Sequence, residues 1–190
     1  MRHNETQPIT RSTMDELRHV IQQLNLRCVR SVLKGLEFPG ASPVLEKEAL
    51  FKRLCSFPLL LADLHFCEPA WWRAAIAERQ VGMPCLDAQV LATFEVAMAV
   101  WRRAEPGALF QLSFGVAPGV CELLMQLSAH DIARVAYQVR PGIELRWSTD
   151  AAFWEDLLEA VVNEDPERWR GMRVHALQLL GRDLARAGDS

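Results

Sequence analysis

Two histidines stand beside residues with which histidine often does chemistry. His65 precedes Cys67 by two positions, and His130 is followed directly by Asp131. A cysteine or a carboxylate beside a histidine can form part of a catalytic pair, but such a pair also needs a group that orients it. Neither stretch supplies an orienting group or a nucleophile-elbow sequence. We therefore expect both histidines to occupy ordinary core or surface positions.

A group of acidic residues is the second candidate for chemistry, because paired carboxylates can transfer protons or hold a metal ion. The group gathers near one expected helix and comprises Glu155, Asp156, Glu159, Glu164 and Asp165. Its helical spacing beside an apolar face favours the solvated side of that helix. The chain also lacks both common glycine-rich phosphate-binding patterns. The sequence predicts a protein that is not an enzyme and uses no cofactor.

The cysteines do not suggest a metal site. Their number is odd, no two form a C-x-x-C pair, and they are spread along the chain as Cys28, Cys55, Cys67, Cys85 and Cys121. A structural zinc site needs clustered ligands, and an odd count leaves a disulfide framework incomplete within one chain. We expect small buried hydrophobic side chains in a reducing cytoplasm, with no bound metal.

Composition narrows the class of protein further. The 190 residues suit one medium domain or two small ones, half of them are apolar, and the net charge is −3. That charge excludes strong nonspecific attraction to nucleic acid. The polar N-terminus lacks a signal-peptide core, and the most apolar window, Phe57 to Phe66, is too short to span a bilayer. We expect a soluble cytoplasmic protein with no membrane contact.

Hydrophobic periodicity predicts a mainly α-helical bundle with one or two short strands. A Thr13-x-x-Glu16 capping box opens the first helix, and Thr149 is placed to cap a later one. Leu59 to Cys67 suits either a short strand or a helical turn. The expected helices run from Thr13 to about Gly35, Pro43 to Leu54, Pro69 to Ile76, Leu86 to Arg103, Ala108 to a Leu112-x-Phe114 corner, Pro118 to Gln126, Ala129 to Tyr137, Thr149 to Val162 and onward from Pro166.

Gly82 and Pro84 mark the best candidate for a junction between two modules. The expected segments are a flexible N-terminus (1–12), a helical module (13–82), a second helical module (83–165) and a C-terminal helix with a tail (166–190). Similar motifs recur in the two modules: Leu36-x-Phe38 with Pro43 resembles Leu112-x-Phe114 with Pro118, and Leu64-x-Phe66 with Trp71-Trp72 resembles Leu145-x-Trp147 with Phe153-Trp154. Chance recurrence and a true duplication both explain this similarity. A duplication predicts two modules that pack about a pseudo-twofold axis.

Two sets of residues are candidates for binding. Basic residues at helical spacing suggest phosphate contacts, although exposed arginines are often only solvated: Arg27, Arg30, Lys34, Arg168, Arg170 and Arg173. Three of the six tryptophans are candidates for a partner surface, with core packing as the alternative: Trp71, Trp72 and Trp101. The helices around 118–126 and 129–137 have helix-turn-helix proportions. The second contains Arg134 but few other cations, so we expect a packing helix rather than a DNA-reading helix.

A resemblance gives these features a functional setting. The Ala108-Leu-Phe-x-Leu112 corner, the Leu123 to Ser128 junction and the closing Leu145-x-Trp147 resemble the FlhD subunit family of bacterial transcriptional activators, including relatives on conjugative elements. In the junction, Ser128 stands at an expected helix N-cap with Asp131 three residues later. The resemblance covers roughly Leu86 to Leu158. The chain departs from the family in its added N-terminal half and in Ile143, where some members have a disulfide-forming cysteine.

The resemblance implies a non-enzymatic subunit of a heteromeric complex that activates promoters of flagellar, secretion or mobile-element transfer genes. Its partner would be an FlhC-like zinc-containing protein that supplies much of the DNA contact, and the chain itself would be a homodimer or an internal pseudo-dimer. An alternative is an intracellular chaperone or anti-regulator that binds a protein partner through a hydrophobic surface. Such a protein would expose an apolar groove and act without DNA.

Overall fold

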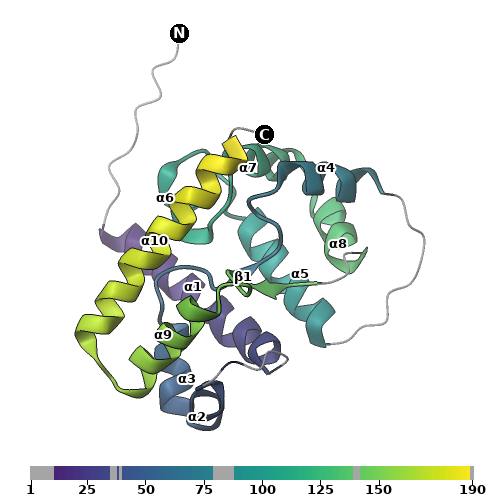
Figure 1. Ribbon diagram of the computed structural model, residues 1–190. Helices are drawn as coiled ribbons and strands as arrows, with labels where there is room; N and C mark the ends of the chain where they lie inside the picture. The colour runs from purple at the N-terminus through teal and green to yellow at the C-terminus, as the bar shows by residue number, and fades with distance from the viewer. Residues whose placement is uncertain (1–10, 35–37, 39, 79–87, 139–141, 189–190) are drawn as a thin grey trace.

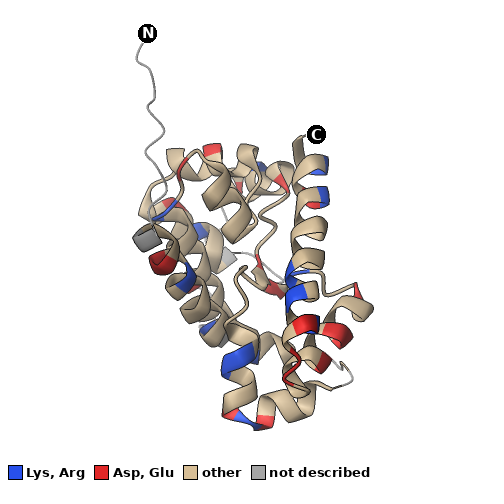
Figure 2. Ribbon diagram, turned by 90° about the vertical axis from the view of Figure 1, so that its left-hand side faces the viewer, with Lys and Arg blue, Asp and Glu red and all other residues tan. Residues whose placement is uncertain are grey.

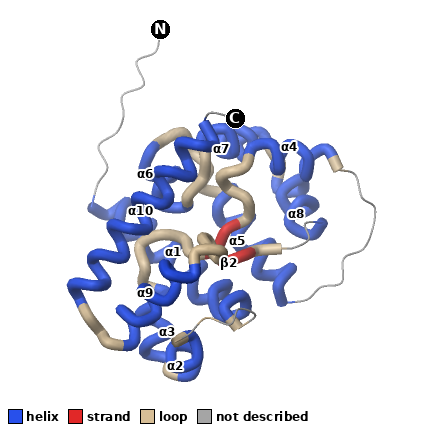
Figure 3. The backbone as a smooth tube through the Cα atoms, in the orientation of Figure 1, coloured by secondary structure: helices blue, strands red, loops and turns tan. Residues whose placement is uncertain are grey.

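The computed structural model describes residues 11–34, 38, 40–78, 88–138 and 142–188. Within these ranges the chain forms ten α-helices and one small two-stranded antiparallel sheet. The mainly helical fold with short strands that the sequence predicts is therefore confirmed. Figure 3 shows the two strands at the centre of the molecule with helices around them.

The first half of the chain consists of α1 (Arg11–Leu33), α2 (Ala41–Glu46), α3 (Glu48–Cys55), β1 (Ala62–Asp63) and α4 (Pro69–Ala77). The second half consists of α5 (Ala88–Trp101), α6 (Ala108–Phe114), α7 (Pro118–Gln126), α8 (Ala129–Gln138), β2 (Glu144–Leu145), α9 (Ala151–Val162) and α10 (Pro166–Gly188). In Figure 1, α10 runs along one side of the molecule from α9 towards α7. The expected junction at Gly82 lies outside the described residues.

The cap between α7 and α8 has the geometry that the sequence predicts. The Ser128 hydroxyl accepts a hydrogen bond from the Asp131 amide at 3.2 Å, and the Asp131 carboxylate accepts one from the Ser128 amide at 3.1 Å. These reciprocal bonds satisfy backbone donors that the first turn of a helix leaves free. The Ser128 hydroxyl also donates to the Asp131 carboxylate at 2.6 Å. This bond, together with the one from the Ser128 amide, lowers the pKa of Asp131, because both favour its ionised form.

Three predicted helix boundaries are wrong. The helix expected from Pro43 to Leu54 is two helices separated by the extended Lys47, which lets the buried faces of α2 and α3 both reach α9. Asp150, rather than Thr149, caps α9 by accepting a hydrogen bond from the Phe153 amide at 3.1 Å. Helix α1 begins at Arg11, so Thr13 lies inside the helix and is not its N-cap.

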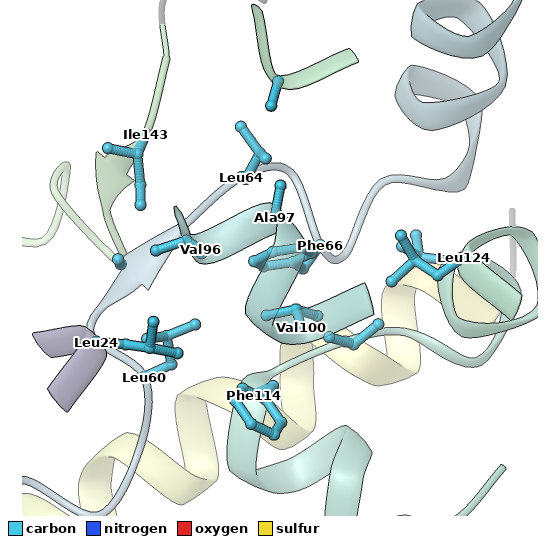
Figure 4. Close-up of a cluster of buried hydrophobic side chains, with 14 of the residues drawn as sticks. Leu24, Leu60, Leu64, Phe66, Val96, Ala97, Val100, Phe114, Leu124 and Ile143 are labelled. Carbon is cyan, nitrogen blue, oxygen red and sulfur yellow. The ribbon is translucent and has the colours of Figure 1, made fainter. Parts of the chain in front are cut away.

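Two hydrophobic clusters form the core, and each draws on both halves of the chain. The first joins α5, α6, α7 and α8 to part of α1, the residues around β1 and Trp72 of α4. Figure 4 shows part of it, with Phe66 from the first half beside Ala97 and Val100 of α5. The second joins α2 and α3 to α9 and α10. Neither half can therefore bury its apolar side chains without the other.

The backbone repeats itself around the two strands at an offset of 82 residues (144 minus 62, the first residues of β2 and β1). Two residues after each strand, His65 and Trp147 adopt left-handed backbone angles with φ of 51° and 55°. The next helices, α4 and α9, begin at the same offset, at residues 69 and 151. The turn before each helix is closed by an equivalent bond of 2.9 Å, from Glu68 to His65 and from Asp150 to Trp147.

Strand pairing and helix packing are reciprocal as well. Ala62 pairs with Leu145, and Asp63 pairs with Glu144. At the offset of 82, Leu145 corresponds to Asp63 and Glu144 corresponds to Ala62, so the pairing is reciprocal. A twofold axis between two identical strands produces this arrangement. Helices α2 and α3 pack on α9, whereas α7 and α8 pack on α4, and the long helices α1 and α5 pack on each other.

The corner motifs repeat less well. Phe114 is fully buried and contacts Phe110, whereas Phe38 stacks on Trp154 with ring centroids 5.7 Å apart. Leu112 is 40% exposed, unlike the buried Phe114 of the same corner. Its expected counterpart, Leu36, lies outside the described residues.

Candidate functional site

The six cations expected to contact phosphate do not form a common basic face. On α1, Arg27 pairs with Glu95 at 3.3 Å, and Arg30 pairs with Glu48 at 2.6 Å. Lys34 is exposed at the end of that helix. Two of these three charges are thus already balanced by carboxylates within the chain.

The same holds for α10. Arg168 binds both Asp156 and Glu159, at 2.7 and 2.8 Å, and these bonds raise its pKa. Arg170 pairs with Glu167 at 3.0 Å. In Figure 2 acidic and basic residues are interspersed, and acidic ones gather near the α9–α10 turn. Among the described residues, Lys34 and Arg173 are the members of the six for which no ion pair is found.

Helix α8 is built for packing. Ile132, Val135 and Ala136 are buried, and the helix lies against α5 and α4. The Arg134 guanidinium donates to the Ile76 and Glu78 carbonyls at 2.9 and 2.6 Å, at the C-terminal end of α4. That end carries free carbonyl groups and a partial negative charge, so a cation stabilises it. Arg134 therefore stabilises the C-terminal end of α4, and its guanidinium does not point towards a ligand site.

The three tryptophans have different roles. Trp72 is completely buried in the first core cluster, so its assignment to a partner surface is wrong. Trp101 is half-buried and donates from its indole nitrogen to the Leu127 carbonyl at 3.0 Å. Trp71 is half-buried too and stacks on His65 with centroids 4.4 Å apart. Of the adjacent pair, Trp71 is the residue that keeps an accessible ring.

Neither histidine forms the catalytic pair considered above. The His65 ring nitrogen lies 2.9 Å from Glu68, whereas the Cys67 thiol lies 3.6 Å from the Gly115 carbonyl. Burial raises the pKa of Cys67 to about 11, which keeps the thiol protonated near neutral pH. Asp131 is engaged with Ser128 rather than oriented towards His130. No nucleophile and base are therefore brought together at either place.

The acidic group also divides between structural roles. Asp156 and Glu159 bind Arg168, Glu164 binds Arg53, and Asp165 caps the first turn of α10. In the described part of the chain, no three His, Cys, Asp or Glu side chains come together as metal ligands. The described cysteines are free thiols, and burial raises the pKa of Cys28 and Cys55 to about 12.

A buried arginine that the sequence analysis overlooked lies at the centre of the molecule. Arg146 is 4% exposed, and its guanidinium donates to the Asp63 carboxylate at 3.1 Å. It also donates to the Phe114 and Gly115 carbonyls at the end of α6, at 3.1 and 3.3 Å. Arg146 thereby fastens both strands to the corner after α6. The sequence feature that could have indicated this buried arginine was a cation at the central position of the otherwise apolar Leu145-x-Trp147 motif.

The surface of the protein has two hollows near the residues described above. One is a cavity of about 440 Å³ beside Arg146, which we call the α4–α10 cavity and which is lined in part by Trp71, Trp147, Asp183 and Arg186. The other, the α1–α6–α10 groove, has a volume of about 220 Å³ and a mainly apolar lining. Leu112 and Leu177 line this groove and are 40% and 46% exposed, and Arg18 and Arg173 also line it.

In the described ranges no single helix is both long and apolar enough to cross a membrane; α6 and α7 together reach that apolar length but are bent by 99°. Comparisons with protein-family models, with curated proteins and with solved structures found no match for this chain.

Proposed function

We propose that this protein is a non-enzymatic subunit of a transcription-activating complex, acting with an FlhC-like zinc-containing protein that makes much of the contact with promoter DNA. The motifs between Ala108 and Trp147 suggest this family. The observation that supports it most directly is the backbone repeat at an offset of 82 residues, with its reciprocal strand pairing. A fused pair of modules is the arrangement expected if one chain replaces a dimer of a shorter FlhD-like protein.

The distribution of charge supports a shared DNA contact. Four of the six candidate phosphate ligands form ion pairs with carboxylates of the same chain. Phosphate contacts dominate the affinity of most DNA-binding proteins, so a chain whose candidate phosphate ligands are mostly paired within the chain needs a partner to hold DNA tightly. This division of labour suits a subunit whose main role is to bind protein.

The test is co-expression with an FlhC-like protein from the same genome, followed by size-exclusion chromatography and promoter-DNA binding at physiological salt. We expect a stable complex that binds promoter DNA, whereas the isolated chain does not. Tight, sequence-specific DNA binding by the isolated chain would contradict the shared-subunit proposal, and so would failure to form any complex.

A second candidate function is a chaperone or anti-regulator, and the α1–α6–α10 groove favours it. The groove could hold an apolar segment of a client protein, with Arg18 and Arg173 facing acidic client residues. Leu177→Glu would then abolish client binding, whereas Leu91→Glu, at a leucine 49% exposed on α5, would not. If binding to this chain prevents the client protein from binding DNA, the result would favour the chaperone or anti-regulator function over the activator function.

A further inference from the structure

The α4–α10 cavity lies at the start of α4 and is large enough for a small molecule. The cap residue and first turn of this helix (68–71) line it together with Asp183, Arg186 and Ala187 at the end of α10. Its volume of about 440 Å³ falls within the range of small-molecule sites in proteins, roughly 300–1,000 Å³. The groups in the lining therefore indicate which kind of molecule could bind there.

The start of α4 lacks the cap that its counterpart in the repeat has. On α9, the Asp150 carboxylate accepts a hydrogen bond from the Phe153 amide at 3.1 Å. The corresponding residues at the offset of 82 are Glu68 and Trp71, but Glu68 makes no side-chain cap bond. Its carboxylate lies 2.9 Å from the His65 ring nitrogen instead. The Trp71 amide thus lacks the carboxylate that the equivalent amide of α9 has, and the partial positive charge of this helix end lies beside the cavity.

A buried cation belongs to the same lining. Arg146 is 4% exposed, and its Nε atom has no hydrogen-bond partner among the described residues. The guanidinium therefore keeps one unpaired donor at the cavity, although its other nitrogens are bound to Asp63 and to the end of α6. This unpaired donor and the uncapped helix start are separate features, and both favour an acceptor or an anion at this place.

The carboxylates of the lining are already bound by donors of the chain. Arg146 binds Asp63 at 3.1 Å, and Asp183 accepts from the Trp147 indole at 2.8 Å and pairs with Arg182 at 3.5 Å. The lining also contains Arg73, which is exposed on α4. In the described part of the chain no carboxylate partner is found for Arg73, so its guanidinium is available to an anion that enters the cavity.

Two indole rings give the cavity flat apolar walls. Trp71 and Trp147 both line it, and both are half-buried. The Trp71 ring is held by stacking on His65 at 4.4 Å, and the Trp147 ring by its bond to Asp183 and its edge-on contact with Phe153 at 4.8 Å. Rings that are fixed in this way suit an aromatic ligand, because no side chain has to be ordered on binding.

We propose that the α4–α10 cavity binds a small aromatic carboxylate. The carboxylate accepts a hydrogen bond from the Trp71 amide, in the place that the Asp150 side chain takes on α9, and pairs with the Arg73 guanidinium. The aromatic ring lies against the indoles of Trp71 and Trp147. This site goes beyond the proposed function and does not depend on it, since it needs neither a partner protein nor DNA.

The test is a titration of the full, nitrogen-15-labelled chain with phenylacetate, followed by NMR. The Trp71 amide and the Trp147 indole signals should shift, with a Kd of about 1 mM or tighter for so small a probe. Phenylacetamide has the same ring and a similar shape but no charge. It should bind about tenfold more weakly, because a hydrogen bond to a charged group is stronger than one to a neutral group.

A matched pair of variants tests the role of the cation. Arg73→Gln removes it from the cavity, and Arg102→Gln makes the same change at an exposed arginine outside the cavity. Both positions are exposed, so both variants should fold. We expect Arg73→Gln to weaken phenylacetate binding about tenfold and Arg102→Gln to leave it unchanged.

Each other outcome would overturn the assignment. Equal affinity for phenylacetate and phenylacetamide would show that the cavity does not select a carboxylate. Equal effects of the two substitutions, or no effect of Arg73→Gln, would show that Arg73 does not hold the anion. Shifts confined to residues away from the cavity, or no shifts at millimolar concentrations of the probe, would refute the site itself. None of these results affects the proposed complex, which is tested by its assembly with the FlhC-like protein.

Discussion

Replacing Arg146 should destabilise the fold more than replacing any exposed arginine. Its guanidinium is 4% exposed and serves three acceptors: the Asp63 carboxylate and the carbonyls of Phe114 and Gly115. Arg146→Met keeps much of the side-chain volume but leaves the carboxylate and both carbonyls without this donor. The C-terminal end of α6 then loses the cation that stabilises it.

The size of the effect follows from the burial of both partners. Removing one member of a buried ion pair costs about 3–5 kcal/mol. The Asp63 side chain is 29% exposed, so water can reach it after the substitution, which favours the lower end of that range. The Arg146 Nε atom lacks a hydrogen-bond partner among the described residues, so the native arrangement carries a cost of its own. We expect a loss of about 3 kcal/mol, or about 6–12 °C in Tm for a chain of this size.

Urea unfolding followed by far-ultraviolet circular dichroism measures this loss, with Asp63→Asn and the double variant completing a thermodynamic cycle. The coupling between Arg146 and Asp63 should exceed about 0.5 kcal/mol, as for residues in direct contact. Arg146→Lys should restore little, because lysine lacks the planar fork that reaches several acceptors together. A loss below about 1 kcal/mol for Arg146→Met would refute the role of this side chain as the fastening between the sheet and α6.

Other features of the fold lead to four more expected outcomes. Ser128→Ala should destabilise the chain by about 0.5–2 kcal/mol in urea unfolding, because the N-cap of α8 is lost. The pKa of Asp131 is lowered from 3.8 by its bonds to Ser128. The contribution of this carboxylate to stability is therefore present near neutral pH and is lost as the pH falls through the lowered pKa. Cys28 and Cys55, whose pKa values burial raises to about 12, should react with a thiol reagent at pH 8 only as fast as the chain unfolds; rapid labelling of the native protein would contradict their burial. The purified chain alone should be a monomer of 21.5 kDa by light scattering, since the two modules already cover each other, and a mass twice that would contradict an internal pseudo-dimer. The isolated chain should bind DNA weakly, without sequence preference and with less affinity at higher salt, which gel-shift titrations of specific and scrambled DNA can check.

Local signals in the sequence were sufficient for most helices. Proline at the first turn placed the starts of α4, α7 and α10, and the Ser128 capping box placed α8. These signals act through backbone groups of the same helix, so they predict its start without knowledge of the tertiary structure. The break at Lys47 could not be predicted from the sequence. It lets α2 and α3 pack separately on α9, and no local pattern indicates a contact with a helix about a hundred residues later in the chain.

The surroundings of the candidate site residues were harder to predict, since they come from distant segments. Arg27 and Arg168 looked like free cations on helix faces, but Glu95 and Asp156 neutralise them from other helices. The adjacent Trp71 and Trp72 had to point to different sides of one helix. Only packing against α7 and α8 decides that Trp72 enters the core. Helical spacing therefore drew attention to these side chains but did not predict the partners that tertiary packing gives them.

The repeat explains why the similarity between the halves is so faint in the sequence. At the offset of 82, His65 corresponds to Trp147, and Glu68 corresponds to Asp150. The side chains differ, but each pair keeps one property that the backbone requires: an unusual positive φ at the first position and a turn-closing amide at the second. A positive φ is uncommon for residues other than glycine, so two occurrences at equivalent positions are more informative than matched leucines. Within the repeat, α10 breaks the symmetry, because it packs along α9, whereas only its C-terminal end comes near α4, where it lines the α4–α10 cavity together with Trp71.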